Sequence, residues 1–190
     1  MNPFEYLSVM ISVVLGLALT ELATLASGLV MHRERVRWDW IPLAWALLVF
    51  LAILQWWWHF FRWSDYDRWT FGMYAALACQ PLVIFQAVRA LLPHPRAEGP
   101  LDLRGHFEHN STLFYALGLC SQTLDLVLMV VGRRLPLAAV LSEWTYTAFF
   151  AIFAVGIFAR RRTLHVALIL LAWLAYGYVT LVAVAQPLLG

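Results

Sequence analysis

Six long apolar segments, separated by short polar joints, dominate the chain. They cover residues 4–31, 40–61, 69–92, 107–132, 135–159 and 163–189. Each comes close to or exceeds the roughly 20 residues that a helix needs to cross a bilayer. The joints between them are too short to hold a separate folded domain. We therefore predict an all-α polytopic membrane protein whose single domain is a bundle of six transmembrane helices.

A stripe of polar and small residues runs through the fourth apolar segment. Ser111, Tyr115, Gly118, Gln122 and Asp125 follow one another every three or four residues, a spacing that places them on one helical face. Asp125 is then expected at membrane depth, where an acidic side chain is costly and usually functional. The stripe predicts a polar site inside the bundle.

Other segments carry polar residues at a similar depth. Gln55 and His59 lie one helical turn apart in the second segment, and Glu143 lies in the fifth. Gln80 precedes Pro81 in the third segment, where the proline removes a backbone hydrogen bond and is expected to kink the helix. The residues expected to line a cation, proton or ligand site are Asp125, Gln122, Glu143, His59, Gln55, Gln80 and Tyr115.

Two carboxylates that share a site of low dielectric cannot both stay ionised without a proton or a cation between them. We expect Asp125 to bind that proton or cation, with Glu143 and His59 tuning its affinity. A structural alternative is that Asp125 pairs with His59 or Arg62 only to fix helix packing.

A second polar set is expected in the opposite half of the bundle. Glu21 and Arg89 are candidates for a buried ion pair, with Gln86 close by, and such a pair more often holds helices together than acts. A weak metal-site candidate lies in the same half, formed by His106, His109 and His165. The sequence requires no cofactor.

Composition supports the membrane interpretation, with 63% hydrophobic and 13% charged residues and a mean hydropathy of +0.74. All 13 basic residues are arginines, so lysine Schiff-base chemistry is excluded. Nine of them fall in the joints of one side and four on the other, which predicts that both termini lie on the non-cytoplasmic side. Because the arginines form no stripe, we expect a lipid bilayer and no nucleic acid as partner.

The first apolar segment carries a face of small residues. Ser8, Ser12, Gly16, Thr20 and Thr24 recur at four-residue intervals, as in faces that let two helix backbones approach closely. The partner is either another helix of this chain or a second protomer of a homo-oligomer.

Three stretches carry a resemblance to other proteins: FEYLSVMISVVLGLALTELATLASGLV, VRWDWIPLAWALLVFLAILQWWWHFF and LFYALGLCSQTLDLVLMVVG. They resemble a group of uncharacterised six-span membrane proteins of bacteria. The resemblance implies a multi-pass protein of the bacterial inner membrane and brings no activity with it.

These observations favour a channel or transporter for protons, a small cation or a proton-coupled solute. Two alternatives stay open. One is a non-catalytic membrane subunit or binding protein for a lipid, a quinone or another hydrophobic ligand, and the other is a membrane metalloenzyme built on the histidines.

Overall fold

The computed structural model describes residues 3–66, 68–94 and 99–185, and it confirms the all-α prediction. The elements, in chain order, are α1 (Pro3–Met31), η1 (Arg33–Arg35), β1 (Val36–Arg37), α2 (Trp40–Phe60), η2 (Phe61–Trp63), α3 (Phe71–Leu91), β2 (Leu101–Asp102), α4 (Leu103–Val127), the π-helical turn η3 (Leu128–Gly132), α5 (Leu137–Ser142), α6 (Trp144–Ile157) and α7 (Arg162–Ala185). Arg96, which entered the orientation prediction, and positions 186–189 of the expected last span lie outside the described residues.

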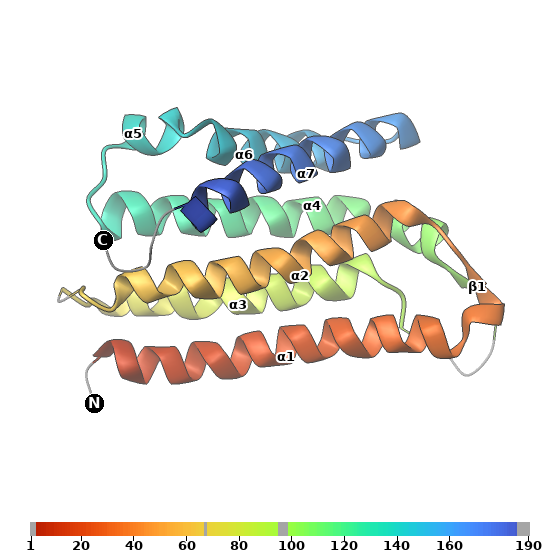
Figure 1. The fold of residues 1–190 in the computed structure, drawn as a ribbon, viewed down its shortest axis with the longest axis horizontal. Helices are drawn as coiled ribbons and strands as arrows, with labels where there is room; N and C mark the ends of the chain where they lie inside the picture. Colours follow the sequence, from red (N-terminus) through yellow and green to blue (C-terminus); the bar gives the residue numbers. More distant parts are fainter. Residues whose placement is uncertain (1–2, 67, 95–98, 186–190) are drawn as a thin grey trace.

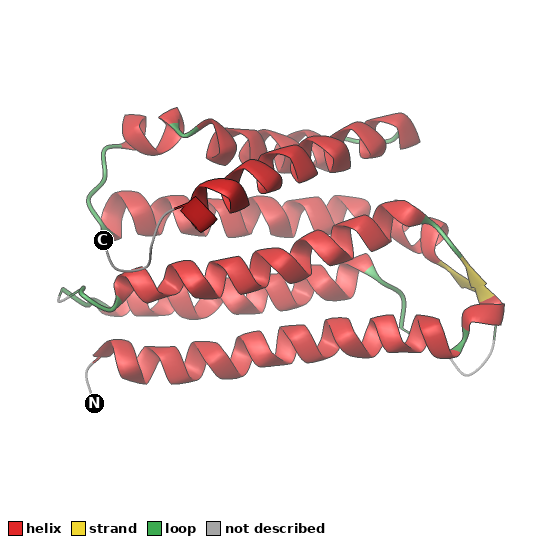
Figure 2. Ribbon diagram, in the orientation of Figure 1, coloured by secondary structure: helices red, strands yellow, loops and turns green. Residues whose placement is uncertain are grey.

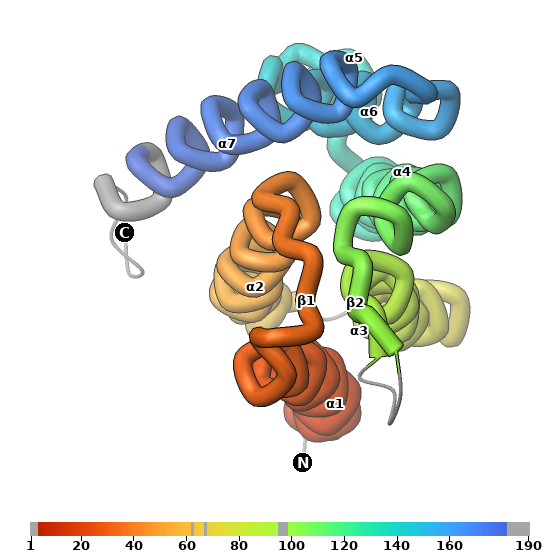
Figure 3. Tube along the Cα trace, turned by 90° about the vertical axis from the view of Figure 1, so that its right-hand side faces the viewer, coloured from red at the N-terminus to blue at the C-terminus, as the bar shows by residue number. Residues whose placement is uncertain are grey.

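The long helices run side by side in alternating directions (Figure 1). Helices α3 and α4 pack against each other, with α1 against α3, α6 against α4, and α7 against α6. Helix α2 lies beside α3 and reaches α7, as the view along the bundle shows (Figure 3). We call the end that holds the first turn of α1 the proximal end, and the end that holds β1 and β2 the distal end.

Five helices are long and apolar enough to cross a membrane: α1, α2, α3, α4 with η3, and α7. Their outer faces carry large exposed apolar side chains such as Val13, Leu82 and Leu174. Exposed tryptophans lie toward both ends, with Trp40 at the distal end of α2 and Trp58 near its proximal end. Apolar flanks with tryptophans at the two ends are typical of helices that contact lipid and its interfaces.

The fifth apolar segment is two helices, α5 and α6, where the sequence predicts one (Figure 2). The backbone leaves the helical conformation at Glu143, which has φ −70° and ψ 100°. The Ser142 hydroxyl donates to the carbonyl of Ala139 at 2.7 Å and the Thr147 hydroxyl to that of Leu141 at 2.8 Å. Hydroxyls from both sides of the break therefore satisfy two carbonyls that precede it, which continuation of the helix would otherwise have paired.

Side-chain caps fix where three of the helices begin. Asp39 accepts a hydrogen bond from Ile41 N at the start of α2, and Thr70 accepts one from Met73 N at the start of α3. Asp102 accepts from Gly105 N at 3.1 Å, so α4 begins four residues before the segment expected over 107–132. An aspartate or threonine at this position supplies an acceptor for the unpaired N–H groups of the first turn.

The small-residue face of α1 points away from the bundle. Ser12, Gly16, Thr20 and Thr24 are exposed, and a Cβ added at Gly16 would meet no atom within 4 Å. The opposite face of α1 buries Leu7, Ile11, Leu15, Ala18, Leu22, Leu25 and Leu29. Within the described chain no helix covers the small-residue face, and its contact with a second protomer stays a prediction.

Candidate functional site

A cavity of about 350 Å³ lies inside the bundle, bordered by α2, α3, α4, α6 and α7. It is lined by Trp45, Leu48, Val49, Ala52, Ile53, Gln55, Trp56, His59, Gln80, Val83, Ile84, Ala87, Phe114, Leu117, Gly118, Ser121, Gln122, Asp125, Thr145, Tyr146, Phe149, Phe153, Tyr176 and Val179. The predicted site residues Gln55, His59, Gln80, Gln122 and Asp125 are all among them. The structure therefore brings together residues from three of the apolar segments that the sequence pattern singled out.

The two ends of the cavity differ in chemistry. Helices α2 and α4 run in the same direction, so Trp45 and Phe114 meet at the distal end, with ring centroids 5.2 Å apart, while His59 and Asp125 lie at the proximal end. Phe114 and Asp125 are separated by about 16 Å along α4 at the rise of an α-helix. The cavity is therefore elongated, with an aromatic distal end and a polar proximal end.

Packed aromatic rings close the distal end. Trp45 is 0% exposed and Phe114 2%, and Tyr115 behind them is also 0% exposed. The Phe153 ring from α6 lies against both Trp45 and Phe114, with centroid distances of 6.1 Å and 6.5 Å. The polar residues of the proximal end are partly exposed, apart from Gln80. The distal end is therefore the more tightly packed of the two.

Gln80 presents an unpaired acceptor. Its Nε2 donates to the backbone carbonyl of Ser121 at 3.3 Å and contacts the Ser121 hydroxyl at 2.8 Å. A backbone carbonyl only accepts hydrogen bonds, which fixes the amide orientation. Gln80 is 2% exposed and its Oε1 has no hydrogen-bond partner within the described chain. The Nε2 of Gln55 is likewise buried and unpartnered there. Buried polar groups without a hydrogen-bond partner are rare in folded proteins, because a hydrogen bond that is lost on burial and not replaced costs free energy.

Asp125 faces this cavity without a counter-charge. No ion pair or hydrogen bond joins its carboxyl to another side chain in the part of the chain that the structure describes. His59 lines the same cavity, and the side chain of Arg62, the other expected partner, lies outside the described residues. The Tyr146 hydroxyl donates to the Gln122 carbonyl and lies within electrostatic range of Asp125.

Two predicted site residues lie elsewhere. Glu143 is exposed at the break between α5 and α6 and does not line the cavity. Tyr115 is buried behind the distal aromatic wall, where its hydroxyl lies 3.1 Å from Nδ1 of His165. In their place the cavity includes Tyr146, which follows Glu143 on the same expected polar stripe, and Ser121, which the sequence pattern did not single out.

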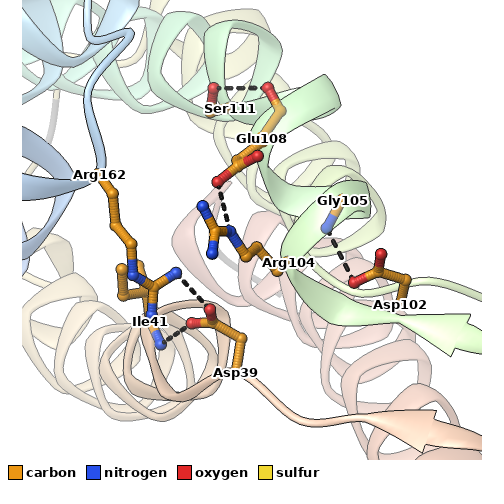
Figure 4. Close-up of polar contacts among 8 residues, drawn as sticks. All are labelled: Asp39, Ile41, Asp102, Arg104, Gly105, Glu108, Ser111 and Arg162. Atoms are coloured by element: carbon orange, nitrogen blue, oxygen red, sulfur yellow. Dashed lines mark hydrogen bonds and ion pairs between the residues drawn. The ribbon is translucent and has the colours of Figure 1, made fainter.

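A second polar cluster joins α2, α4 and α7 at the distal end (Figure 4). Arg162 of α7 forms an ion pair with Asp39, whose side chain is 5% exposed. On α4, Arg104 Nε donates to Glu108 at 2.8 Å, and this pair is exposed. The cluster ties the first turn of α7 to the first turn of α2, which is a structural role.

The ion pair expected between Glu21 and Arg89 is present. Arg89 Nε lies 3.5 Å from Glu21 Oε1, and His94 Nε2 lies 3.1 Å from the same oxygen. The pair is not buried as expected, because half of the Arg89 side chain is exposed, and Gln86 is exposed as well. The sequence analysis did not anticipate His94 as the third member.

The histidines do not form a ligand set. His165 is buried against the Tyr115 ring at 5.7 Å, whereas His109 is exposed on α4. In the described ranges, no group of three or more histidine, cysteine, aspartate or glutamate side chains is arranged to hold a metal ion. The metalloenzyme alternative therefore has no geometric support in this part of the chain.

Comparison with protein-family models, with curated proteins and with solved structures finds no match. The function is accordingly inferred from the chemistry of the cavity.

Proposed function

We propose that the protein is a small transporter of the bacterial inner membrane that binds a cation, or a proton-coupled solute, at Asp125. The observation that carries this proposal is a carboxyl without a described counter-charge, facing a cavity that also holds unpaired amide groups of Gln80 and Gln55. An acidic side chain that faces the interior of a membrane bundle is by default a functional group. A group with a purely structural role would be expected to have its partner in place.

The proposed topology has six crossings, with both termini on the non-cytoplasmic side. Helix α6 alone is about 21 Å long, too short for a hydrocarbon core of about 30 Å. Residues 137–157 together extend about 31 Å at helical rise, so we assign α5 and α6 jointly to the fifth crossing. The proximal end, and with it the polar mouth of the cavity, then faces away from the cytoplasm.

The closed distal end favours a carrier over an open channel. Trp45, Phe114 and Phe153 pack against one another at the distal end of the cavity. A solute that enters from the proximal side passes only if these rings and the helices behind them rearrange. Binding at Asp125 followed by such a change is the alternating exposure that a carrier requires.

The test is a flux measurement with purified protein in liposomes. Proton and sodium uptake are recorded with a pH-sensitive and a sodium-sensitive dye under an imposed potential. We expect uptake above empty liposomes, a loss of about tenfold or more with Asp125→Asn, and wild-type uptake with Glu143→Gln, the matched control outside the cavity. A tenfold loss corresponds to about 1.4 kcal/mol of lost interaction with the carboxylate. Uptake by Asp125→Asn equal to wild type refutes the proposal.

A second candidate function is supported by the apolar lining. Most of the residues around the cavity are aliphatic or aromatic, as in sites for hydrophobic ligands. A protein that only holds such a ligand would show no uptake of any ion in the liposomes, and would retain an apolar molecule detectable by native mass spectrometry after purification.

A further inference from the structure

We propose that the occupant of the cavity is an amphipathic amine, a protonated nitrogen carried on an apolar body. This inference rests on the transport function proposed above and names its substrate class. It follows from three properties of the cavity: which hydrogen-bonding groups its proximal end offers, what lines the remainder, and how far apart the two regions lie.

The polar groups at the proximal end favour a ligand that donates hydrogen bonds and carries positive charge. Gln80 Oε1 and the Asp125 carboxyl are both acceptors without a described partner, and the Ser121 contact fixes the orientation of the Gln80 amide. Ser121 and Asp125 are one helical turn apart, about 6 Å along α4, so one small group can approach both acceptors. An alkylammonium carries three donors and no acceptor, which matches this pair.

The lining of the remainder of the cavity favours a ligand with an apolar body. Between Asp125 and the distal wall the lining consists of residues such as Ala52, Leu117, Phe149 and Phe153. A ligand that bonds to Asp125 and fills this region extends up to about 16 Å toward Phe114. The volume of about 350 Å³ lies at the lower end of the range for small-molecule sites. Aromatic faces also attract a cation that approaches them.

Other occupant classes leave part of the cavity unsatisfied. An inorganic cation would pair with Asp125 and leave the aromatic region empty, and unfilled apolar volume destabilises a packed interior. A neutral hydrocarbon would fill that region and leave Asp125 and Gln80 Oε1 without donors, at the cost of buried unpaired groups. An anion would face the carboxylate directly. Of these classes, the molecule with both parts is the one that fills the apolar region and also supplies donors to Asp125 and Gln80 Oε1.

The experiment compares three ligands of one shape that differ in the head group: 4-phenylbutylamine, 4-phenylbutan-1-ol and 4-phenylbutanoate. Binding to the full chain in lipid nanodiscs is measured by titration calorimetry, with protein-free nanodiscs subtracted for partition into lipid. We expect the amine to bind at least about tenfold more tightly than the alcohol, because a hydrogen bond to a charged group is the stronger kind. The carboxylate is expected not to bind.

Three variants tie binding to the cavity. Asp125→Asn is expected to weaken amine binding about tenfold or more and to leave alcohol binding within about twofold. Ala52→Phe fills the apolar region without touching a polar group, and is expected to remove binding of amine and alcohol alike. It tests the same site if Asp125→Asn fails to fold, which circular dichroism will show. Glu143→Gln, the control, is expected to bind the amine as wild type does.

The possible results separate the substrate class from the transport function. Equal affinity for amine and alcohol, or amine binding that survives both Asp125→Asn and Ala52→Phe, overturns the inference. Absence of amine binding alongside Asp125-dependent ion flux also overturns it and leaves the transport function standing. Amine binding that depends on Asp125, in a protein that moves neither protons, nor sodium, nor the amine itself into liposomes, supports the substrate class and refutes transport.

Discussion

Two glycines in the contact between α4 and α6 offer a test of the packing around the cavity. A Cβ added at Gly156 would lie 2.3 Å from Cδ1 of the Tyr115 ring, and one added at Gly118 would lie 2.3 Å from Cε1 of the Phe153 ring. Each contact is far shorter than van der Waals distance, so each alanine forces its ring to move. What differs is the room that the ring has.

The Tyr115 ring has no free volume into which it can move. It is 0% exposed, its ring lies 5.8 Å from that of Trp45, and its hydroxyl is bonded to His165. Overpacking a filled core costs about 1–3 kcal/mol, and loss of the hydrogen bond adds about 1 kcal/mol. Replacing a helical glycine by alanine returns about 1 kcal/mol of propensity. Gly156→Ala is therefore expected to lower the free energy of unfolding by about 1–3 kcal/mol.

Phe153 is partly exposed and borders the cavity, so its ring can turn into open volume. The overpacking cost is then small and the gain in propensity offsets it. Gly118→Ala is expected to change the free energy of unfolding by less than about 0.5 kcal/mol. The displaced ring takes up part of the cavity, so the same variant is expected to weaken amine binding.

The assay is unfolding by sodium dodecyl sulfate in mixed micelles, followed by far-ultraviolet circular dichroism. Gly16→Ala on the open face of α1, where a Cβ meets no atom within 4 Å, measures the propensity gain alone in the same chain. If Gly118→Ala and Gly156→Ala destabilise equally relative to this control, Phe153 has no free volume beside it and the reasoning about the cavity is refuted.

The distal cluster supplies the remaining predictions, measured by the same unfolding assay. Arg162→Gln leaves the buried Asp39 without its charged partner and is expected to lower the free energy of unfolding by about 2–3 kcal/mol. Arg104→Gln breaks an exposed pair within α4 and is expected to lower it by at most about 0.5 kcal/mol. Equal effects of the two substitutions would contradict the burial argument. Tyr115→Phe, which removes the hydroxyl that contacts His165, is expected to cost about 1 kcal/mol, and no loss would show that this contact contributes nothing.

The polar stripe on α4 shows which features of the site helical periodicity can predict. A spacing of three to four residues predicted that Gln122 and Asp125 face the bundle interior, and both line the cavity. The same stripe placed Tyr115 in the same site, but Tyr115 lies behind the distal wall with His165. Periodicity gives the direction in which a side chain points. It does not give the depth at which neighbouring helices leave a space.

Glu143 shows where periodicity fails. Its expected place in the interior assumed an uninterrupted helix over 135–159, and the backbone leaves the helix at that residue. The stretch from Leu141 to Thr147 contains no proline or glycine, the residues from which a helix break can be predicted. Ser142 and Thr147, whose hydroxyls bond to backbone carbonyls beside the break, were the available signal, and serine and threonine have that ability in any helix.

Long-range contacts were beyond the sequence pattern altogether. Asp39 and Arg162 are 123 residues apart, and neither belongs to a spacing that predicts the other. Asp39 is fixed as the cap of α2 two residues after β1, and the parallel pairing of β1 with β2 holds that region beside the start of α4. The partner of each side chain depends on how these connections fold, which a single sequence does not specify.

The division of polar groups between the two ends bears on how a carrier of this shape would work. At the proximal end the polar residues of α2 and α4 face the cavity. Among the described residues, no ion pair of Asp125 ties α4 to α2 there. At the distal end the Asp39–Arg162 pair holds the start of α2 to the start of α7. A movement that separates these two helix ends breaks that pair, and an isolated carboxylate in that position is costly. In a carrier that opens at this end, binding in the cavity would have to offset that cost, which would couple occupancy of the site at Asp125 to movement of α7.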